Sequence, residues 1–208
     1  ALQALLVVLY VILLSGGINL VTADLGRHLA NGKLFLADWS PLATNTYSYT
    51  HPDFPVLNHH WLFGVFSYLV FLVGGFPGTH LAFIAVNVAA FLIFFRIAAR
   101  KAGLPLASVA ALLFMPIIAE RTEIRPEALS YLFAGVSFLL LLKRRENGLS
   151  NKMLVAALGL LQILWINVHI YFFLGWALVG AFLVESVSVS GFKSARTRVL
   201  ALCFGTVL

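Results

Sequence analysis

Long uncharged runs alternate with short charged segments along the chain. Residues 1–23 carry no charge, and the runs that follow the first polar segments are apolar on every side rather than alternating as strands do. Most approach the length of about 20 residues that a helix needs to cross about 30 Å of hydrocarbon. The pattern predicts an all-α polytopic membrane protein with about six or seven transmembrane helices, at about 2–21, 78–97, 104–120, 127–143, 152–168 and 170–188, with a further one from about 198.

The segment 23–36 predicts a different kind of helix. Leu25 and Leu29 fall near one stripe, which is typical of an amphipathic helix lying on the bilayer. Asp24 and His28 are four residues apart and are expected to share the opposite, polar face.

The segment 58–74 is also expected to lie at the interface. Its apolar stretch, 61–73, is only 13 residues long, and glycine and proline at 74–78 interrupt the helix before the next span. We therefore predict one long outer loop, 22–77, that carries two juxtamembrane helices at about 23–36 and 58–74.

Composition and charge agree with this topology. The chain is 61% hydrophobic and 11% charged, whereas soluble proteins carry about 25% charged residues. If 58–74 does not cross, ten Lys and Arg share one side with two acids, a net +8, and four share the other with six acids, a net −2. The positive-inside rule then predicts that 98–103, 143–152 and 189–198 are cytoplasmic and that 22–77, 120–127 and 167–170 are outside.

This distribution explains the net charge of +6 as a topology signal, so no nucleic-acid partner is expected. All six histidines lie on the outer side or at its boundary, together with most of the acids. We expect any chemistry to take place on that face, with membrane lipids as the surroundings. The chain does not begin with Met, and its last apolar run stops at Leu208, so we expect 1–208 to be one transmembrane domain of a longer protein.

Several polar motifs on the outer side carry a family resemblance. They are Asp24-x-x-x-His28-Leu29-x-x-Gly32, Thr46-Tyr47-Ser48-Tyr49-Thr50, Asn58-His59-His60-Trp61-Leu62, Arg125-Pro126-Glu127 and Trp165-x-Asn167-x-His169. On these motifs the chain resembles the N-terminal half of bacterial polyprenyl-phosphate-dependent glycosyltransferases of the GT-C class, which includes protein O-mannosyltransferases and aminoarabinose transferases. The resemblance covers most of 15–185.

The resemblance implies a glycosyltransferase that moves a sugar from a polyprenyl-phosphate donor to an acceptor at the outer face of the bacterial cytoplasmic membrane. Asp24 matches the acid of the first outer loop and is expected to be the catalytic base, although Asp before a helix is also a common N-cap. Relatives often carry a second acid next to it, whereas this chain has Leu25. The sequence therefore gives no support to a paired-carboxylate mechanism at this position. The lipid-linked sugar donor is the expected ligand, and a divalent metal is an open but unsupported alternative.

Histidines and the second outer turn supply candidate substrate-binding groups. His28 is expected to orient Asp24 or to bind phosphate, and His59 is favoured over His60, which adjoins Trp61 and suits an interfacial anchor. A zinc site from His28, His59 and His169 is the less favoured alternative, because the close spacing of known zinc motifs is missing.

Arg121 and Arg125 are expected to clamp a phosphate, with Glu127 beside them. The alternative is that these arginines pair with the acids of the same turn in a closed ion network.

Asn167 and His169 join two predicted spans with almost no loop, so they either support the pocket wall or tie two helix ends together. Asn87 and Gln162 lie in the middle of predicted spans and are expected to form interhelical hydrogen bonds. The chain as a whole has one alternative function: a non-catalytic scaffold for a lipid-linked glycan, or half of a transporter. Transport requires a polar path through the bilayer, and no charge is found in the middle of the predicted spans.

Overall fold

A computed structural model describes residues 1–208 except 17–23, 41, 121–122, 147 and 208. The described chain is all-α. Its elements are α1 (Leu2–Leu14), α2 (Leu25–Asp38), α3 (Trp61–Ala102), α4 (Leu104–Ala119), α5 (Glu127–Arg145), α6 (Asn151–Val168), the short 3-10 helix η1 (Ile170–Phe172), α7 (Phe173–Ser190) and α8 (Ala195–Val207).

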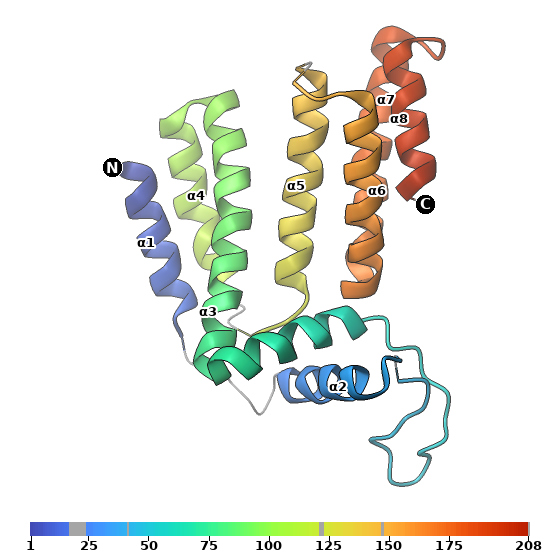
Figure 1. Cartoon of the computed structure of the whole chain (residues 1–208). Helices are drawn as coiled ribbons and strands as arrows, with labels where there is room; N and C mark the ends of the chain where they lie inside the picture. The colour runs from blue at the N-terminus through green and yellow to red at the C-terminus, as the bar shows by residue number, and fades with distance from the viewer. Residues whose placement is uncertain (17–23, 41, 121–122, 147, 208) are drawn as a thin grey trace.

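The helices form a bundle with a second layer across one end. Most of them stand side by side, while α2 and the first part of α3 lie across the end where α5 begins (Figure 1). We call α2 and residues 61–74 of α3 the transverse layer. The predicted helices at 23–36 and 58–74 are both present, the first as α2 and the second as the start of α3.

A kink in α3 separates the transverse layer from the bundle. Gly75 has φ 60° and ψ −156°, which is a conformation that side chains with a Cβ rarely adopt. Thr79 donates a hydrogen bond of 2.8 Å from its Oγ1 to the carbonyl oxygen of Gly75, and Pro77 lacks the amide that a continuous helix would use. The predicted break at 74–78 is confirmed.

Three helices are long and apolar enough to cross a membrane, which supports a membrane protein: α3, α6 and the η1–α7 segment. α1 and α4 are apolar but shorter, with 13 and 16 residues, and α5 carries Glu127 at one end and three cations at the other. The total of six or seven spans stays a prediction. The end of the first predicted span lies outside the described residues from residue 17 on.

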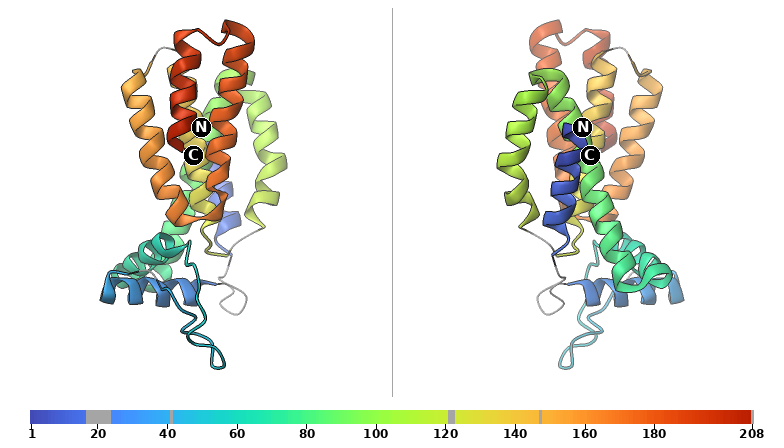
Figure 2. Two further views of the ribbon diagram at one scale, coloured as in Figure 1. Left: turned by 90° about the vertical axis from the view of Figure 1, so that its right-hand side faces the viewer. Right: turned by 90° about the vertical axis from the view of Figure 1, so that its left-hand side faces the viewer.

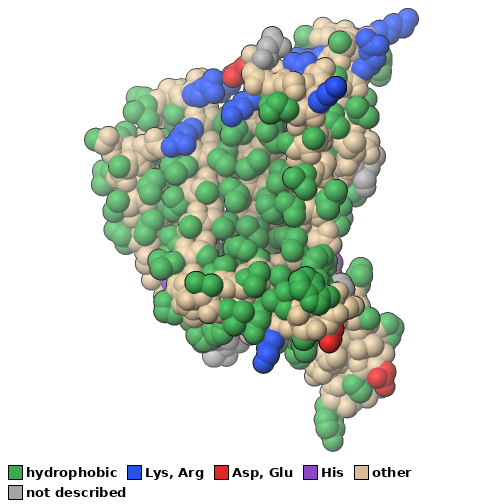
Figure 3. Space-filling view, in the orientation of Figure 1, with side chains coloured by type: hydrophobic (Ala, Val, Ile, Leu, Met, Phe, Trp, Pro, Cys, Tyr) green, Lys and Arg blue, Asp and Glu red, His purple; other side chains and the backbone are tan. Residues whose placement is uncertain are grey.

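The order of the helices places the charged junctions as the predicted topology requires. The junctions 98–103, 143–152 and 189–198 lie at the end of the bundle away from the transverse layer, whereas the starts of α5 and η1 lie beside that layer (Figures 1 and 2). Lys and Arg side chains gather at the far end in the space-filling view (Figure 3). Which end faces the cytoplasm stays a prediction.

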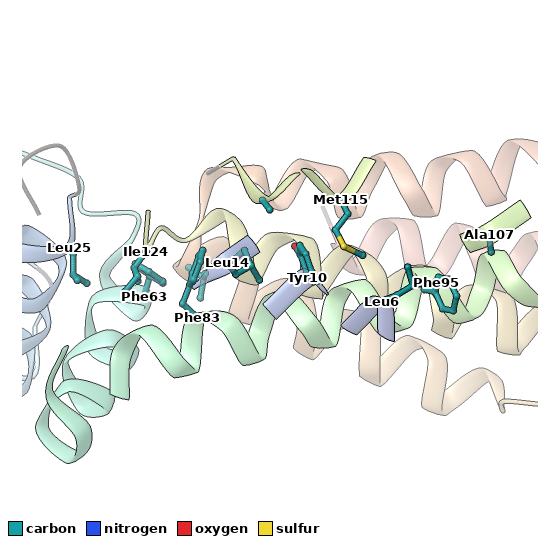
Figure 4. Packing of buried hydrophobic residues seen from close by; sticks show 13 residues of the cluster. Leu6, Tyr10, Leu14, Leu25, Phe63, Phe83, Phe95, Ala107, Met115 and Ile124 are labelled. Carbon is teal, nitrogen blue, oxygen red and sulfur yellow. The ribbon is translucent and has the colours of Figure 1, made fainter. Parts of the chain in front are cut away.

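One hydrophobic cluster joins the transverse layer to the bundle. It runs from Leu6 and Tyr10 of α1 past Phe83 of α3 to Phe63 and Leu25 in the layer (Figure 4). Leu25 is completely buried. The layer is therefore held by packing as well as by chain connectivity. A second cluster links α5, α6, α7 and α8.

Candidate functional site

The site is built on the buried face of α2. Leu25, His28, Asn31 and Gly32 are buried and follow one another at helical spacing, whereas Asp24 is exposed. The prediction that Asp24 and His28 share a polar face is wrong. His28 belongs to the buried stripe because α2 turns the side that carries Gly32 toward α3.

Two glycines allow α2 and α3 to touch backbone to backbone. A Cβ at Gly32 would collide with the carbonyl of Gly64 and come within 2.8 Å of the Cβ of Tyr68, and a Cβ at Gly64 would lie 2.9 Å from the carbonyl oxygen of His28. No side chain larger than hydrogen fits between these backbones. This contact explains why glycine follows His28 four residues later in the motif, and it fixes the position of the imidazole.

Asp24 lies at the N-terminal boundary of α2 but does not cap it. Its side chain accepts no capping hydrogen bond; instead it forms an ion pair of 3.3 Å with Nη2 of Arg27, and both side chains are about half exposed, at 48% and 47%. The carboxylate is thus accessible at the surface of the transverse layer.

The histidines of three separate motifs meet in one cluster. The ring centroids of His28 and His60 are 5.9 Å apart, those of His60 and His169 5.3 Å, and those of His59 and His60 4.0 Å. His60 is therefore the central ring, while His59 is exposed and directs its Nδ1 to the carbonyl oxygen of Leu57 at 3.3 Å. His60, the residue directly before α3, therefore contacts the other histidine motifs, whereas His59 lies at the surface; the choice of His59 as a substrate-binding residue stays a prediction.

Burial keeps these imidazoles neutral. It lowers the pKa of His28 to about 4, assisted by the positive charge of Arg27, and lowers the pKa of His60 to about 3, assisted by its neighbour His59. Burial also lowers the pKa of His169, against an opposing effect of Glu127. At pH 7 the imidazoles of His28, His60 and His169 can donate or accept hydrogen bonds, but they supply no positive charge for a phosphate.

His28 is buried with one ring nitrogen unsatisfied among the described residues. The side chain is 2% exposed, its ring meets Phe63 edge-on at 4.8 Å, and its Nδ1 finds no hydrogen-bond partner among the described residues. Its helix neighbour Asn31 is satisfied, since the Tyr47 hydroxyl donates to Asn31 Oδ1 over 2.5 Å and thereby ties the outer loop to α2.

A hydrogen-bonded chain fixes His169. Trp165 Nε1 donates to Ser130 Oγ at 2.9 Å, and Ser130 Oγ lies 2.9 Å from His169 Nδ1. Trp165 and Ser130 are completely buried. Because Trp165 can only donate, the hydroxyl proton of Ser130 is left for His169 Nδ1, an order that fits a neutral imidazole. Ser130 is absent from the sequence motifs and was not predicted, since a serine within an apolar run gives no signal of its partners.

Asn167 ties two helix ends together. Its Oδ1 accepts a hydrogen bond of 2.7 Å from Trp61 Nε1, and its amide donates to the carbonyl of Ile163 at 2.7 Å. Trp61 also stacks on Phe35 of α2, with centroids 4.6 Å apart. Of the two alternatives, the structural tie is the one observed, and it joins α6 to the transverse layer.

The second outer turn contributes charge beside the histidines. Arg125 Nε lies 2.6 Å from Glu123 Oε2, with both side chains about one quarter to one third exposed. Part of the predicted ion network is therefore present. Arg121 lies outside the described residues. Glu123, Arg125 and Glu127 together line a small cavity of about 20 Å³ that reaches Asn87 and Tyr131.

A larger cavity of about 330 Å³ adjoins the small one and opens at the surface of the bundle, where its lining residues Phe114 and Ile118 are exposed. Both are lined by Asn87, Ile118 and Tyr131, and the rest of the larger wall is almost entirely apolar. Asn87 was expected to bond to another helix, but its amide donates to Phe83 of its own helix at 2.9 Å. By contrast, Gln162 donates to the carbonyl of Phe172 across the α6–η1 turn at 3.2 Å, an interaction between two elements as predicted.

The predicted residues converge around His28. Asp24, Arg125 and His169 are all close enough for their charges to affect its pKa. Within the described ranges, no group of three or more His, Cys, Asp or Glu side chains is arranged to hold a metal ion. No protein-family model, curated protein or solved structure matches the chain.

Proposed function

We propose that this protein is a membrane glycosyltransferase that moves a sugar from a polyprenyl phosphate to an acceptor on the side of the membrane where the transverse layer lies. The observation that carries the proposal is the pair of adjoining cavities, one apolar and about 330 Å³, the other small and charged. A lipid phosphate has the same order of parts, a hydrocarbon chain followed by an anionic head. The apolar cavity suits the chain, and Arg125, which shares the small cavity with Glu123 and Glu127, is the cation proposed to meet the phosphate at its edge.

Asp24 is the residue proposed as base. The acceptor hydroxyl attacks the anomeric carbon while the bond from that carbon to the phosphate oxygen breaks on the opposite side. The hydroxyl proton passes to the Asp24 carboxylate, and polyprenyl phosphate departs as an anion stabilised by Arg125. One in-line displacement inverts the anomeric configuration. The exposure of Asp24 supports this role because the acceptor then arrives from water and the donor from the membrane.

His28 and His60 have a positioning role in this scheme. Their pKa values of about 4 and about 3 mean that they act as neutral hydrogen-bonding groups rather than as phosphate-binding cations. Nδ1 of His28 has no hydrogen-bond partner among the described residues, so a hydroxyl group of the sugar donor or a bound water can bond to it. The positive charge required at the phosphate therefore rests on Arg125, with Arg121 as a further candidate.

A specific observation favours the second candidate function, a non-catalytic scaffold that binds a lipid-linked glycan. Asp24 is paired with Arg27 and lines neither of the two adjoining cavities. A binding protein needs the cavities and the arginine but has no need of a base.

The test is transfer from a radiolabelled polyprenyl-phosphate sugar by the full-length protein, with donor binding measured in parallel. We expect Asp24→Asn to lower turnover by about 10²-fold or more while donor binding stays unchanged, because only proton transfer is lost. Arg125→Gln should weaken donor binding by about 10-fold or more.

Asp38→Asn provides the matched control, since Asp38 is an exposed acid at the other end of α2. Full turnover by Asp24→Asn would refute the proposed base. Tight donor binding without transfer by the unmodified protein, across a panel of acceptors, would favour the scaffold.

A further inference from the structure

A further cavity, separate from the two adjoining ones, lies at the end of the bundle opposite the transverse layer. It measures about 270 Å³ and lies between the C-terminal ends of α5 and α7 and the start of α8. This is the end where the cations gather (Figure 3). The wall combines three guanidinium groups with an apolar surface: Arg144, Arg145, Arg196, Leu141, Phe182 and Val199.

One carboxylate holds two of the arginines in place. Glu185 Oε1 lies 2.9 Å from Arg145 Nη2, and Glu185 Oε2 lies 3.0 Å from Arg196 Nη2. Each ion pair uses one terminal nitrogen of a group that has five N–H donors, so Glu185 orients both guanidinium groups without occupying their other donors. Arg144 donates from Nε to the amide oxygen of Asn151 at 2.7 Å. Three guanidinium groups therefore line the cavity, and Glu185 pairs with two of them.

We propose that this cavity binds the phosphate group of an anionic phospholipid, with part of the lipid against the apolar wall. The chemistry shared by all its possible ligands is a phosphate, which the planar guanidinium forks match. A free phosphate has no use for an apolar wall, whereas Leu141, Phe182 and Val199 give a glycerol backbone or the first methylenes of a chain a surface to cover. Basic pockets between helices at a membrane boundary bind lipid headgroups by this combination of contacts.

The site is independent of the proposed transfer reaction. It lies at the other end of the bundle from Asp24 and Arg125, so its failure and the failure of the glycosyltransferase proposal are distinguishable. Its occupant would contact α5, α7 and α8, which Glu185 links through its ion pairs with Arg145 and Arg196.

The experiment counts bound phosphatidylglycerol on the full-length protein by native mass spectrometry from an uncharged detergent. Arg145→Gln and Arg196→Gln are each expected to weaken binding by about 10-fold or more. Arg100→Gln is the matched control, because Arg100 also lies at this end and pairs with a glutamate, Glu146, but does not line the cavity. Val199→Trp fills the cavity while leaving every charge in place, and it should abolish binding.

Four results decide the proposal. Loss of binding in the two cavity-arginine variants and in Val199→Trp, with binding retained in Arg100→Gln, supports it. An equal loss in Arg100→Gln would show general charge attraction and overturn the site. Displacement of the lipid by 10-fold lower concentrations of inorganic phosphate or glycerol phosphate would overturn the phospholipid assignment. Unchanged binding in Val199→Trp, with the thermal unfolding temperature of each variant measured to confirm folding, would overturn the cavity as its location.

Discussion

The two ends of the bundle differ in how far their titratable and charged side chains are buried. At the transverse layer, His28, Ser130 and His169 are at most 5% exposed, and they are held neutral by burial or by hydrogen bonds. At the opposite end, Arg100 and Lys101 pair with Glu146 while remaining 65% and 59% exposed. One end buries imidazole groups, and the other keeps these ion pairs hydrated and buries only neutral hydroxyls such as those of Ser186 and Thr197 among the described residues.

The physical reason is the cost of desolvation. Burying a neutral hydrogen-bonded group costs far less than burying an ion, so an internal polar site is made from imidazole, hydroxyl and indole rather than from charged side chains. Cations that set topology need only stay hydrated on the correct side of the membrane. The stability of the layer end should therefore depend on packing and pH, whereas the stability of the cationic end should depend on little other than ionic strength. Four predictions test this contrast.

The largest effect is expected at the contact between α2 and α3. Gly32→Ala introduces a methyl group against the backbone of Gly64, which cannot rotate away as a side chain could. We expect a loss of about 3 kcal/mol or more in the free energy of unfolding, with release of the transverse layer. Thermal unfolding in detergent and protease sensitivity of the outer loop measure both effects.

Gly26→Ala is the control on the same helix, because a Cβ there meets nothing within 4 Å. It should be neutral or stabilising by about 0.5–1 kcal/mol, as Ala favours helix over Gly. Equal behaviour of the two variants would refute the close approach of the helices.

The next effect is the pH dependence of the layer. Unfolded His28 takes up a proton below about pH 6.5, whereas folded His28 does so only at about pH 4. The unfolded state therefore binds more protons within this window, and the contribution of His28 to the free energy of unfolding should fall by about 2–3 kcal/mol as the pH drops from 6.5 to 4. His60 and His169, whose pKa values are also lowered by burial, add a loss in the same direction. Below that window the contribution of His28 levels off.

Unfolding by urea across this pH range measures the dependence. His28→Phe keeps the ring against Phe63 and should make the curve shallower by the share of His28, while the shares of His60 and His169 remain. His51→Gln, which removes an exposed histidine of the outer loop, should leave the curve unchanged. Identical curves for His28→Phe and the unmodified protein would contradict the assignment.

A comparison of two buried serines gives a somewhat smaller effect. Ser130→Ala removes the bridge between Trp165 and His169 and leaves two buried polar atoms without that partner, at a cost of about 2 kcal/mol. Ser67 is equally buried, but its hydroxyl finds no partner among the described residues. Ser67→Ala should therefore be neutral or slightly stabilising. Thermal unfolding of both variants measures the difference, and a larger loss for Ser67→Ala would reverse the interpretation.

Sequence reasoning predicted the fold at the level of periodicity and charge. The break at Gly75, the helix on either side of it and the order of the bundle helices all follow from runs of apolar residues and their punctuation. The rotation of α2 could not be predicted in this way. Its direction depends on a glycine pairing with Gly64, thirty-two residues away in the chain, and amphipathicity alone assigned His28 to the wrong face.

For the candidate site, the sequence motifs predicted which residues lie close together but not which contacts and hydrogen bonds each of them makes. Asp24, Arg125 and His169 were predicted from three separate segments, and all three act on His28. The choice between His59 and His60 depends on the first turn of α3, and the role of Ser130 depends on a contact with α6; neither leaves a local pattern. Neutralisation of the histidines likewise follows from burial, which a sequence does not display.

The smallest expected effect lies at the cationic end. Arg100 and Lys101 hold the pKa of Glu146 below its usual range, yet all three side chains are well hydrated, so Glu146→Gln should produce no measurable change in the unfolding temperature. Ionic strength should act in the same way: raising salt from 0.05 to about 0.5 M screens these pairs, while the buried hydrogen bonds of the layer feel little of it. A variant series measured in both salts separates the two ends. If Glu146→Gln destabilises the protein as strongly as Ser130→Ala, the cationic end carries structural weight of its own, and the division between an internal neutral site and a hydrated charged boundary fails.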